Sequence, residues 1–396
     1  MTTTETKRGI FALMLAHVAG MLDLVALPVW VGTLISQYQF APQQAGGLAT
    51  LFLLGASLAS MLLAPRFNRI KPKFAAVLGF GVACIAFALA SRSAAFEVLA
   101  PLHLVGGLAA GVALSSTHGT IGHAANPHRT FAFAGLAIGI FGIIFLGAAP
   151  AIIDANGGHM LFVLFAVVMA VAALAGLFFF PGVTRHTVGD EVEEAEAAGR
   201  KPPPLGAAVW FSIVAIALMC MTQAMTLSFF ERVGEHRGFS LQMITVALVV
   251  YGIVTLFPAP IAALLERKIA ATTVISIFPI FQALFAMIAM STSNYVLYAA
   301  SGALMAFTII FVHTFAFGLL ARLDPTGRAV AGTPAMLMAG SAIAPFLGGT
   351  LVQFVGFEAI GYAAIVLVLI ELLCFNQTRR IVTRNRPVIL ASPAKA

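Results

Sequence analysis

The chain has 396 residues, of which 60% are hydrophobic and only 9% are charged, and its mean hydropathy is +1.00. A soluble protein carries about 25% charged residues, so this composition excludes a water-soluble globule and favours a protein covered by lipid. The formal net charge of +7 resides in the segments between apolar runs. We therefore interpret it as a signal of membrane orientation and expect no nucleic-acid partner.

Twelve apolar runs follow one another along the chain. A membrane-spanning helix needs about 20 predominantly apolar residues, and each run is close to that length or longer. The first run is too long for a signal-peptide core and lacks a small-residue cleavage site, so we expect it to be retained. The runs cover residues 10–36, 44–64, 74–91, 97–120, 130–152, 160–181, 207–231, 241–264, 271–290, 295–320, 329–354 and 357–376.

The distribution of Lys and Arg orients these runs. If the N-terminus is cytoplasmic, 19 of the 22 Lys and Arg residues lie inside, and only Arg92, Arg232 and Arg237 lie outside. Such an excess is typical of cytoplasmic loops. We therefore expect a multi-pass protein of the bacterial inner membrane with both termini in the cytoplasm.

The loop at residues 182–206 divides the chain into halves. It carries five of the fifteen acidic residues and three consecutive prolines, which indicates a solvated linker. The segment Asn126-Pro127-His128-Arg129 before the fifth run is echoed by Asp324-Pro325-Thr326-Gly327-Arg328 before the eleventh. This predicts parallel six-helix repeats: an all-α membrane fold with one bundle at 1–181, the cytoplasmic linker, a second bundle at 207–378 and a cytoplasmic tail at 379–396.

Cysteine usage and short motifs give no sign of an enzyme. Cys84, Cys220 and Cys374 fall in three different runs and have no CxxC partner, so core packing is favoured over disulfides or zinc. No P-loop, HExxH or GxSxG motif stands on a suitable element. We expect no catalytic residue, no metal and no cofactor.

The loop between the second and third runs resembles a family motif. Leu63-Ala64-Pro65-Arg66-Phe67-Asn68-Arg69-Ile70-Lys71 is similar to the G-x-x-x-D-R-x-G-R-[KR] loop of the major facilitator superfamily, with Pro65 in place of the Asp. The chain resembles this family over essentially its full length, and the resemblance implies the twelve-helix fold around a central cavity. In the family this loop helps to latch the two halves on the cytoplasmic side. The latch residues implied here are Arg66, Arg69, Arg129, Glu266, Arg267 and Arg328.

The eleventh run carries the sharpest match. Gly340-Ser-Ala-Ile-Ala344-Pro345-Phe-Leu-Gly348-Gly349 is similar to the family's G-x-x-x-G-P-x-x-G-G. A weaker copy without the proline occupies the fifth run at Gly135, Gly139 and Gly142, where the family pattern is associated with exporters. Glycines let helices approach closely and proline bends them, so these positions predict either a bendable helix or ordinary close packing.

The fourth run offers a titratable residue. His103-Leu-Val-Gly106-Gly107-Leu-Ala-Ala-Gly111 resembles the family's R-x-x-Q-G-x-G-A-A stretch, with His103 at the Arg position. In the family this Arg is linked to proton transfer. Unlike Arg, a His can titrate near neutral pH. His103 is therefore a candidate for proton coupling, and a packed histidine is the alternative.

Asp23 is the one acidic residue near the middle of a run. A charge there costs at least ~2.5–3.5 kcal/mol, so it calls for a function. Counting 1.5 Å per residue places Asp23 and His103 each about 20 Å from the inner edge. The two could face each other and carry a proton, or Asp23 could be a structural hydrogen-bonding residue. The other acids lie in loops or at helix ends, where Glu371 can snorkel.

Weaker candidates surround this pair. Gln223 is offset from Asp23 by 200 residues and could be its neutral counterpart in the second bundle. Trp30, on the Asp23 face, could line a substrate pocket or anchor the outer interface, and the anchor is favoured. His17 lies off the Asp23 face, and His118 and His313 are interpreted as interface residues.

These features predict a secondary active transporter that couples protons to the movement of a small lipophilic or aromatic molecule by alternating access. Export is favoured, because no run contains Lys or Arg and 33 Phe residues are present. A proton symporter for small organic or aromatic acids is the alternative, with His103 as the anion contact. A membrane sensor or assembly factor that transports nothing is the alternative of another class. We expect a monomer whose partners are its substrate, protons and the bilayer.

Overall fold

A computed structural model of the chain describes residues 3–4, 6–124, 126–182, 204–266, 268–324, 329 and 333–384. Helices make up all the regular secondary structure of these ranges. Twelve of the helical segments are long and apolar enough to cross a membrane, which confirms the predicted fold class and number of spans. In a bilayer each backbone polar group needs a partner within the protein, and a helix supplies one for nearly all of them.

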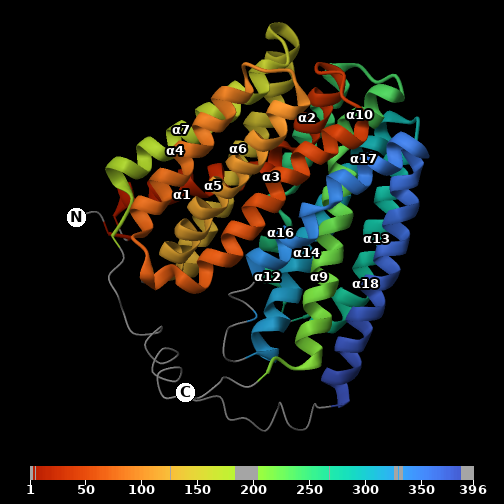
Figure 1. The fold of residues 1–396 in the computed structure, drawn as a ribbon. Coiled ribbons are helices and arrows are strands. Elements are labelled where there is room, and N and C mark those ends of the chain that lie inside the picture. Colours follow the sequence, from red (N-terminus) through yellow and green to blue (C-terminus); the bar gives the residue numbers. More distant parts are fainter. Residues whose placement is uncertain are drawn as a thin grey trace.

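The helices form two sets of six spans (Figure 1). The first set contains α1 (Lys7–Gly20), α2 (Leu22–Ser36), α3 (Pro42–Leu63), the 3-10 helix η1 (Ala64–Arg69), α4 (Pro72–Ala90), α5 (Phe96–Gly122), α6 (Pro127–Asn156) and α7 (His159–Phe179). The second contains α9 (Ala207–Ser228), α10 (Phe230–His236), α11 (Leu241–Val254), α12 (Pro258–Leu265), α13 (Ala271–Ser291), α14 (Tyr295–Leu323), α16 (Thr333–Ala342), α17 (Ala344–Phe354) and α18 (Glu358–Arg384).

The observed bounds differ little from the apolar runs. The main difference is α18, which continues to Arg384, so residues 379–384 are helical although the sequence assigned them to the tail. Most of the linker at 182–206 and the remainder of the tail lie outside the described residues.

Four spans are broken into two helices. Pro258 and Pro345 each stand in the first turn of the helix after a break, where the missing N–H and the fixed φ of proline are tolerated. The first span is interrupted at Met21, directly after Gly20, a poor helix former. The seventh is interrupted at Phe229, after hydroxyl side chains that bond back to the carbonyl four residues earlier and so tend to bend helices.

The two bundles pack together on one side of the membrane. We call the side where α7 ends and α9 begins the linker side. The principal contacts between bundles join α3 to α16 and α17, α6 to α11, and α2 to α9 and α10. Four of these segments, α2, α10, α11 and α17, belong to the half of the molecule opposite the linker, and Figure 1 shows α2, α10 and α17 gathered there.

The contact between α3 and α17 is close enough to require glycine. A Cβ on Gly46 would lie 2.0 Å from the Pro345 carbonyl oxygen, and a Cβ on Gly349 would lie 2.2 Å from that of Pro42. Side chains add hydrogen bonds across the same contact, including Gln43 Nε2 to the Thr350 hydroxyl at 3.1 Å. The two bundles are therefore locked together at this level through their backbones.

Candidate functional site

Asp23 lies in the first turn of α2, directly after the break at Met21. Its side chain is 7% exposed, and Oδ1 is buried without a hydrogen-bond partner among the described residues. No side chain caps the start of α2, and the positive end of its helix dipole lies at the carboxyl. An acid is thus held inside the membrane by a helix terminus, and no ion pair of the described chain involves it.

His103 is fully buried in an aromatic cluster and does not bond to Asp23. Its ring packs against Trp30, Phe87 and Phe162 with centroid separations of 5.5, 6.2 and 5.3 Å. Nδ1 lies 2.7 Å from the Leu99 carbonyl, one turn earlier in α5, and therefore carries the proton in the neutral ring. His103 lies at the level of Trp30, seven residues beyond Asp23, so the predicted pairing of His103 with Asp23 is wrong. The prediction placed both residues at one level because residue counting assumed straight helices along the membrane normal.

Trp30 is the centre of this cluster, and its interpretation as an interface anchor is wrong. The ring is 0% exposed and packs edge-on against Phe52 and Phe165 at 5.2 and 4.7 Å. An interface anchor would present its N–H to the headgroup region, whereas Trp30 Nε1 is buried without a hydrogen-bond partner in the described ranges.

Replacing Trp30 with alanine is expected to destabilise the first bundle by about 3–5 kcal/mol, the usual cost of emptying a buried aromatic position. Thermal unfolding of the purified protein in detergent measures this as a lower melting temperature. The other tryptophan, Trp210, is 56% exposed on α9 and provides the matched control. Equal melting temperatures for Trp30→Ala and Trp210→Ala would contradict the packing role.

Gln223 is held inside the second bundle. It is 9% exposed, and its Nε2 donates to the Tyr251 hydroxyl on α11 at 3.2 Å. The structure therefore places a neutral, hydrogen-bonded amide at the position offset by 200 residues from Asp23.

The structure also contains two pairs of polar side chains that the sequence did not predict, both toward the linker side of the central helices. His17 Nδ1 of α1 lies 3.0 Å from His118 Nε2 of α5, and the rings stack at 5.1 Å. In the second bundle, Cys220 Sγ of α9 lies 3.3 Å from His313 Nε2 of α14. The two pairs join equivalent helices of the two repeats, so His118 and His313 each contact a neighbouring helix of their own bundle.

Two further acids are buried, contrary to their expected place at helix ends. Glu231 stands in the first turn of α10 and is 5% exposed, with Oε2 buried and unpartnered among the described residues. Glu371 of α18 is 0% exposed, and neither of its oxygens has a partner there, so it does not snorkel. In the part of the chain described, no three His, Cys, Asp or Glu side chains are placed to share a metal ion.

The latch residues make no ion pair with one another within the described ranges. Arg66 donates to the Leu62 carbonyl at 2.5 Å, Arg69 is exposed, and Arg129 lies over the Phe133 ring. Glu266 ends α12. Arg267 and Arg328 lie outside the described residues. The latch remains a prediction.

The glycines of the G-x-x-x-G-P-x-x-G-G segment lie at tight contacts. A Cβ on Gly340 would lie 2.0 Å from the Ala217 carbonyl oxygen of α9, and one on Gly348 would meet Phe229 at 2.9 Å. In α6, Gly139 faces Leu256 and Gly142 faces Val25, whereas a Cβ added to Gly135 would meet no neighbouring atom within 4 Å. Close packing and a Pro345 break thus occur together in the eleventh span.

Twelve spans in two repeated bundles, with central helices that carry buried acids and histidines, define a multi-pass membrane transporter. The chain belongs to the Major Facilitator Superfamily, whose family model matches residues 12–332. The resemblance expected from the sequence is therefore confirmed, and membership points to a transporter rather than an enzyme.

Solved structures with the same fold carry varied cargo. A bacterial homologue of the human lysosomal transporter Spinster, in an inward-facing and occupied conformation, aligns with a TM-score of 0.74 and 14% identity, over 96% of this chain and 98% of that one. A D-xylose–proton symporter aligns at 0.71 and 14%, over 93% and 96%. A variant of the nucleoside transporter NupG aligns at 0.70 and 14%, over 94% and 99%. None of the curated proteins matches the sequence significantly.

Proposed function

We propose that this chain is a proton-coupled secondary transporter that exports a small lipophilic or aromatic molecule across a bacterial inner membrane. The observation that carries the proposal is Asp23: a buried acid in mid-membrane, at a helix start, without a cationic partner among the described residues. Such a group is costly to keep ionised in a dry interior and inexpensive to keep protonated. Access to water from one side and then the other would load and unload its proton.

The arrangement of the bundles supports alternating access. They pack together opposite the linker, through α3 and α17 and through α2 and α10. The breaks in the first, seventh, eighth and eleventh spans divide these helices into halves that can reorient separately. If the linker side is cytoplasmic, as the Lys and Arg distribution predicts, this conformation faces inward.

The contents of the central helices favour a lipophilic cargo over an anionic one. Among α1, α2, α5, α9 and α14, Lys and Arg occur only at Lys7, Arg8 and Arg322, near the ends of helices. Binding a carboxylate substrate in the membrane normally requires such a cation. His103, the candidate anion contact of a symporter, is enclosed by aromatic rings and bonded to its own helix.

If the proposal is correct, transport of the cargo is accompanied by movement of protons across the membrane. Protein in liposomes containing a pH-sensitive dye would be exposed to a lipophilic cation, a neutral aromatic compound and an aromatic acid in turn. Proton movement that is driven by the lipophilic cation or by the neutral aromatic compound, and that is absent from empty liposomes, would support the proposed exporter. Proton movement driven only by the aromatic acid would support the symporter instead. Ligand-induced thermal stabilisation without any flux would support the sensor.

A further inference from the structure

Glu231 lies at the boundary between the two bundles. It belongs to α10 in the second bundle, and α10 packs on α2 of the first. A Cβ on Gly32 of α2 would lie 2.5 Å from Glu231 Oε1 and 2.7 Å from its Cδ. The carboxyl group therefore lies directly on the bare backbone of Gly32, and a methyl group at this position would force the carboxyl to shift.

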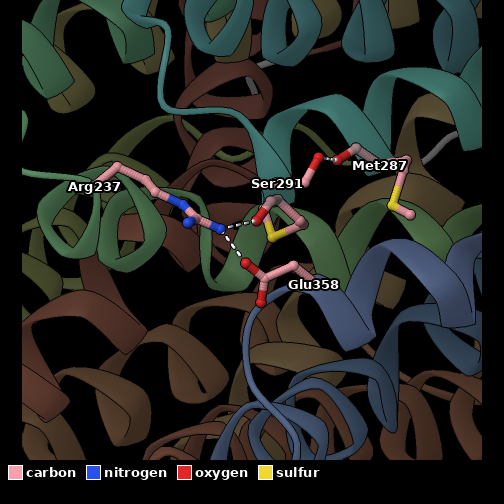
Figure 2. A network of polar contacts seen from close by, with 5 residues as sticks. Arg237, Met287, Ser291 and Glu358 are labelled. Atoms are coloured by element: carbon pink, nitrogen blue, oxygen red, sulfur yellow. Dashed lines mark hydrogen bonds and ion pairs between the residues drawn. The ribbon is translucent and has the colours of Figure 1, made fainter.

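The helix that carries Glu231 is fixed to its own bundle. Arg237, directly after α10, donates to the Met290 carbonyl of α13 at 3.1 Å and pairs with Glu358 at the start of α18. Figure 2 shows the end of the Arg237 side chain pointing toward Glu358, and Nη2 makes both contacts. Tyr298 of α14 also donates to the Phe230 carbonyl at 2.7 Å. If the bundles separate on this side, Glu231 will stay with the second bundle and leave Gly32.

The surroundings of Glu231 offer its carboxyl no free cation within the described chain. The titratable groups facing it are Arg232 and Glu235 of its own helix and Tyr298 of α14. Arg232 pairs with Glu235. The other helices packed on α10 are α9, α11 and α13, which contain no Asp, Glu, Lys or Arg, and α2, whose only such residue is Asp23.

We infer that Glu231 is a second proton-binding residue and that its proton controls contact between the bundles opposite the linker. With the bundles packed, the carboxyl is buried and needs its proton; with the bundles apart, water reaches the carboxyl and it ionises. The inference rests on the proposed proton coupling and extends it. A proton taken up from the side opposite the linker would favour closure there, which is the order of events that proton-driven export requires.

Distance measurements between the bundles test this without knowledge of the cargo. Spin labels would be placed at Ala94 and Ser293, which are exposed in loops of different bundles opposite the linker, after replacement of the three native cysteines. We expect the ratio of separated to packed molecules to rise between pH 5.5 and pH 8, by at most about tenfold per pH unit for one proton. In Glu231→Gln the side chain cannot ionise, so the packed distance should persist at pH 8.

Two variants complete the design. Glu97→Gln is the control, because Glu97 is an exposed acid in the first turn of α5 on the same side of the molecule, and it should respond to pH like the parent protein. Gly32→Ala keeps Glu231 but places a methyl group where the carboxyl lies, and should increase the separated population at both pH values. A pH response in Glu231→Gln equal to that of the parent, or no response in the parent, would overturn the inference. The proton-flux assay tests the proposed function separately, because it does not depend on this gate being the pH-sensitive element.

Discussion

Replacing Asp23 with asparagine is expected to abolish proton-linked transport while leaving the fold intact. Asparagine has nearly the same shape and can occupy the first turn of α2, but it cannot exchange a proton. Since no ion pair in the described chain depends on Asp23, no opposing charge is left unpaired by the change. The variant should therefore still bind cargo and should melt within a few degrees of the parent protein.

The measurement is cargo flux into liposomes driven by a pH gradient, compared with exchange of cargo at equal pH on both sides. A carrier that has lost only its proton site should retain exchange and lose gradient-driven accumulation. Asp154→Asn is the matched control, because Asp154 is exposed on α6 near the side opposite the linker. Undiminished gradient-driven flux in Asp23→Asn would exclude Asp23 as the coupling residue.

The sequence predicted the spans and the two bundles well, because both depend on properties that are local in the chain. An apolar run of sufficient length must become a helix in lipid, whatever its neighbours. The repeat and the position of the linker also follow from the order of residues alone. Membrane-buried Asp23 stood out for the same reason: a charge within an apolar run is visible without any knowledge of packing.

The helix breaks could not be predicted from local properties of the sequence. Because they were not foreseen, His17 and Glu231 were misplaced. His17 was set aside because its angle to Asp23 was extrapolated along one continuous helix, whereas the helix is interrupted at Met21. Glu231 was placed at a helix end because its apolar run stops there, whereas the span continues through α10 to His236. Its carboxyl lies against Gly32, some 200 residues away in the chain.

Replacing Gly349 with alanine is expected to prevent the bundles from packing opposite the linker, with a strong loss of transport. The added methyl carbon would lie 2.2 Å from the Pro42 carbonyl oxygen and 2.8 Å from its carbon, whereas ordinary contacts are 3.4–4 Å. Both are backbone atoms, so the contact cannot be relieved by a side-chain rotation, and α17 must move away from α3. Gly46, which meets the Pro345 backbone in the same contact, should respond in the same way.

The spin labels at Ala94 and Ser293 measure this effect directly, and Gly349→Ala should show mainly the longer distance at any pH. Gly135→Ala on α6 is the matched control, since nothing lies within 4 Å of its added carbon and alanine favours a helix over glycine. This contact differs from that of Glu231 because it involves no titratable group. We expect Gly349→Ala to separate the bundles at both pH values and Glu231→Gln to hold them packed at pH 8. In that case the backbone contact determines whether this side can close, and the proton on Glu231 determines at which pH it closes. A packed distance in Gly349→Ala would contradict the requirement for glycine between α3 and α17.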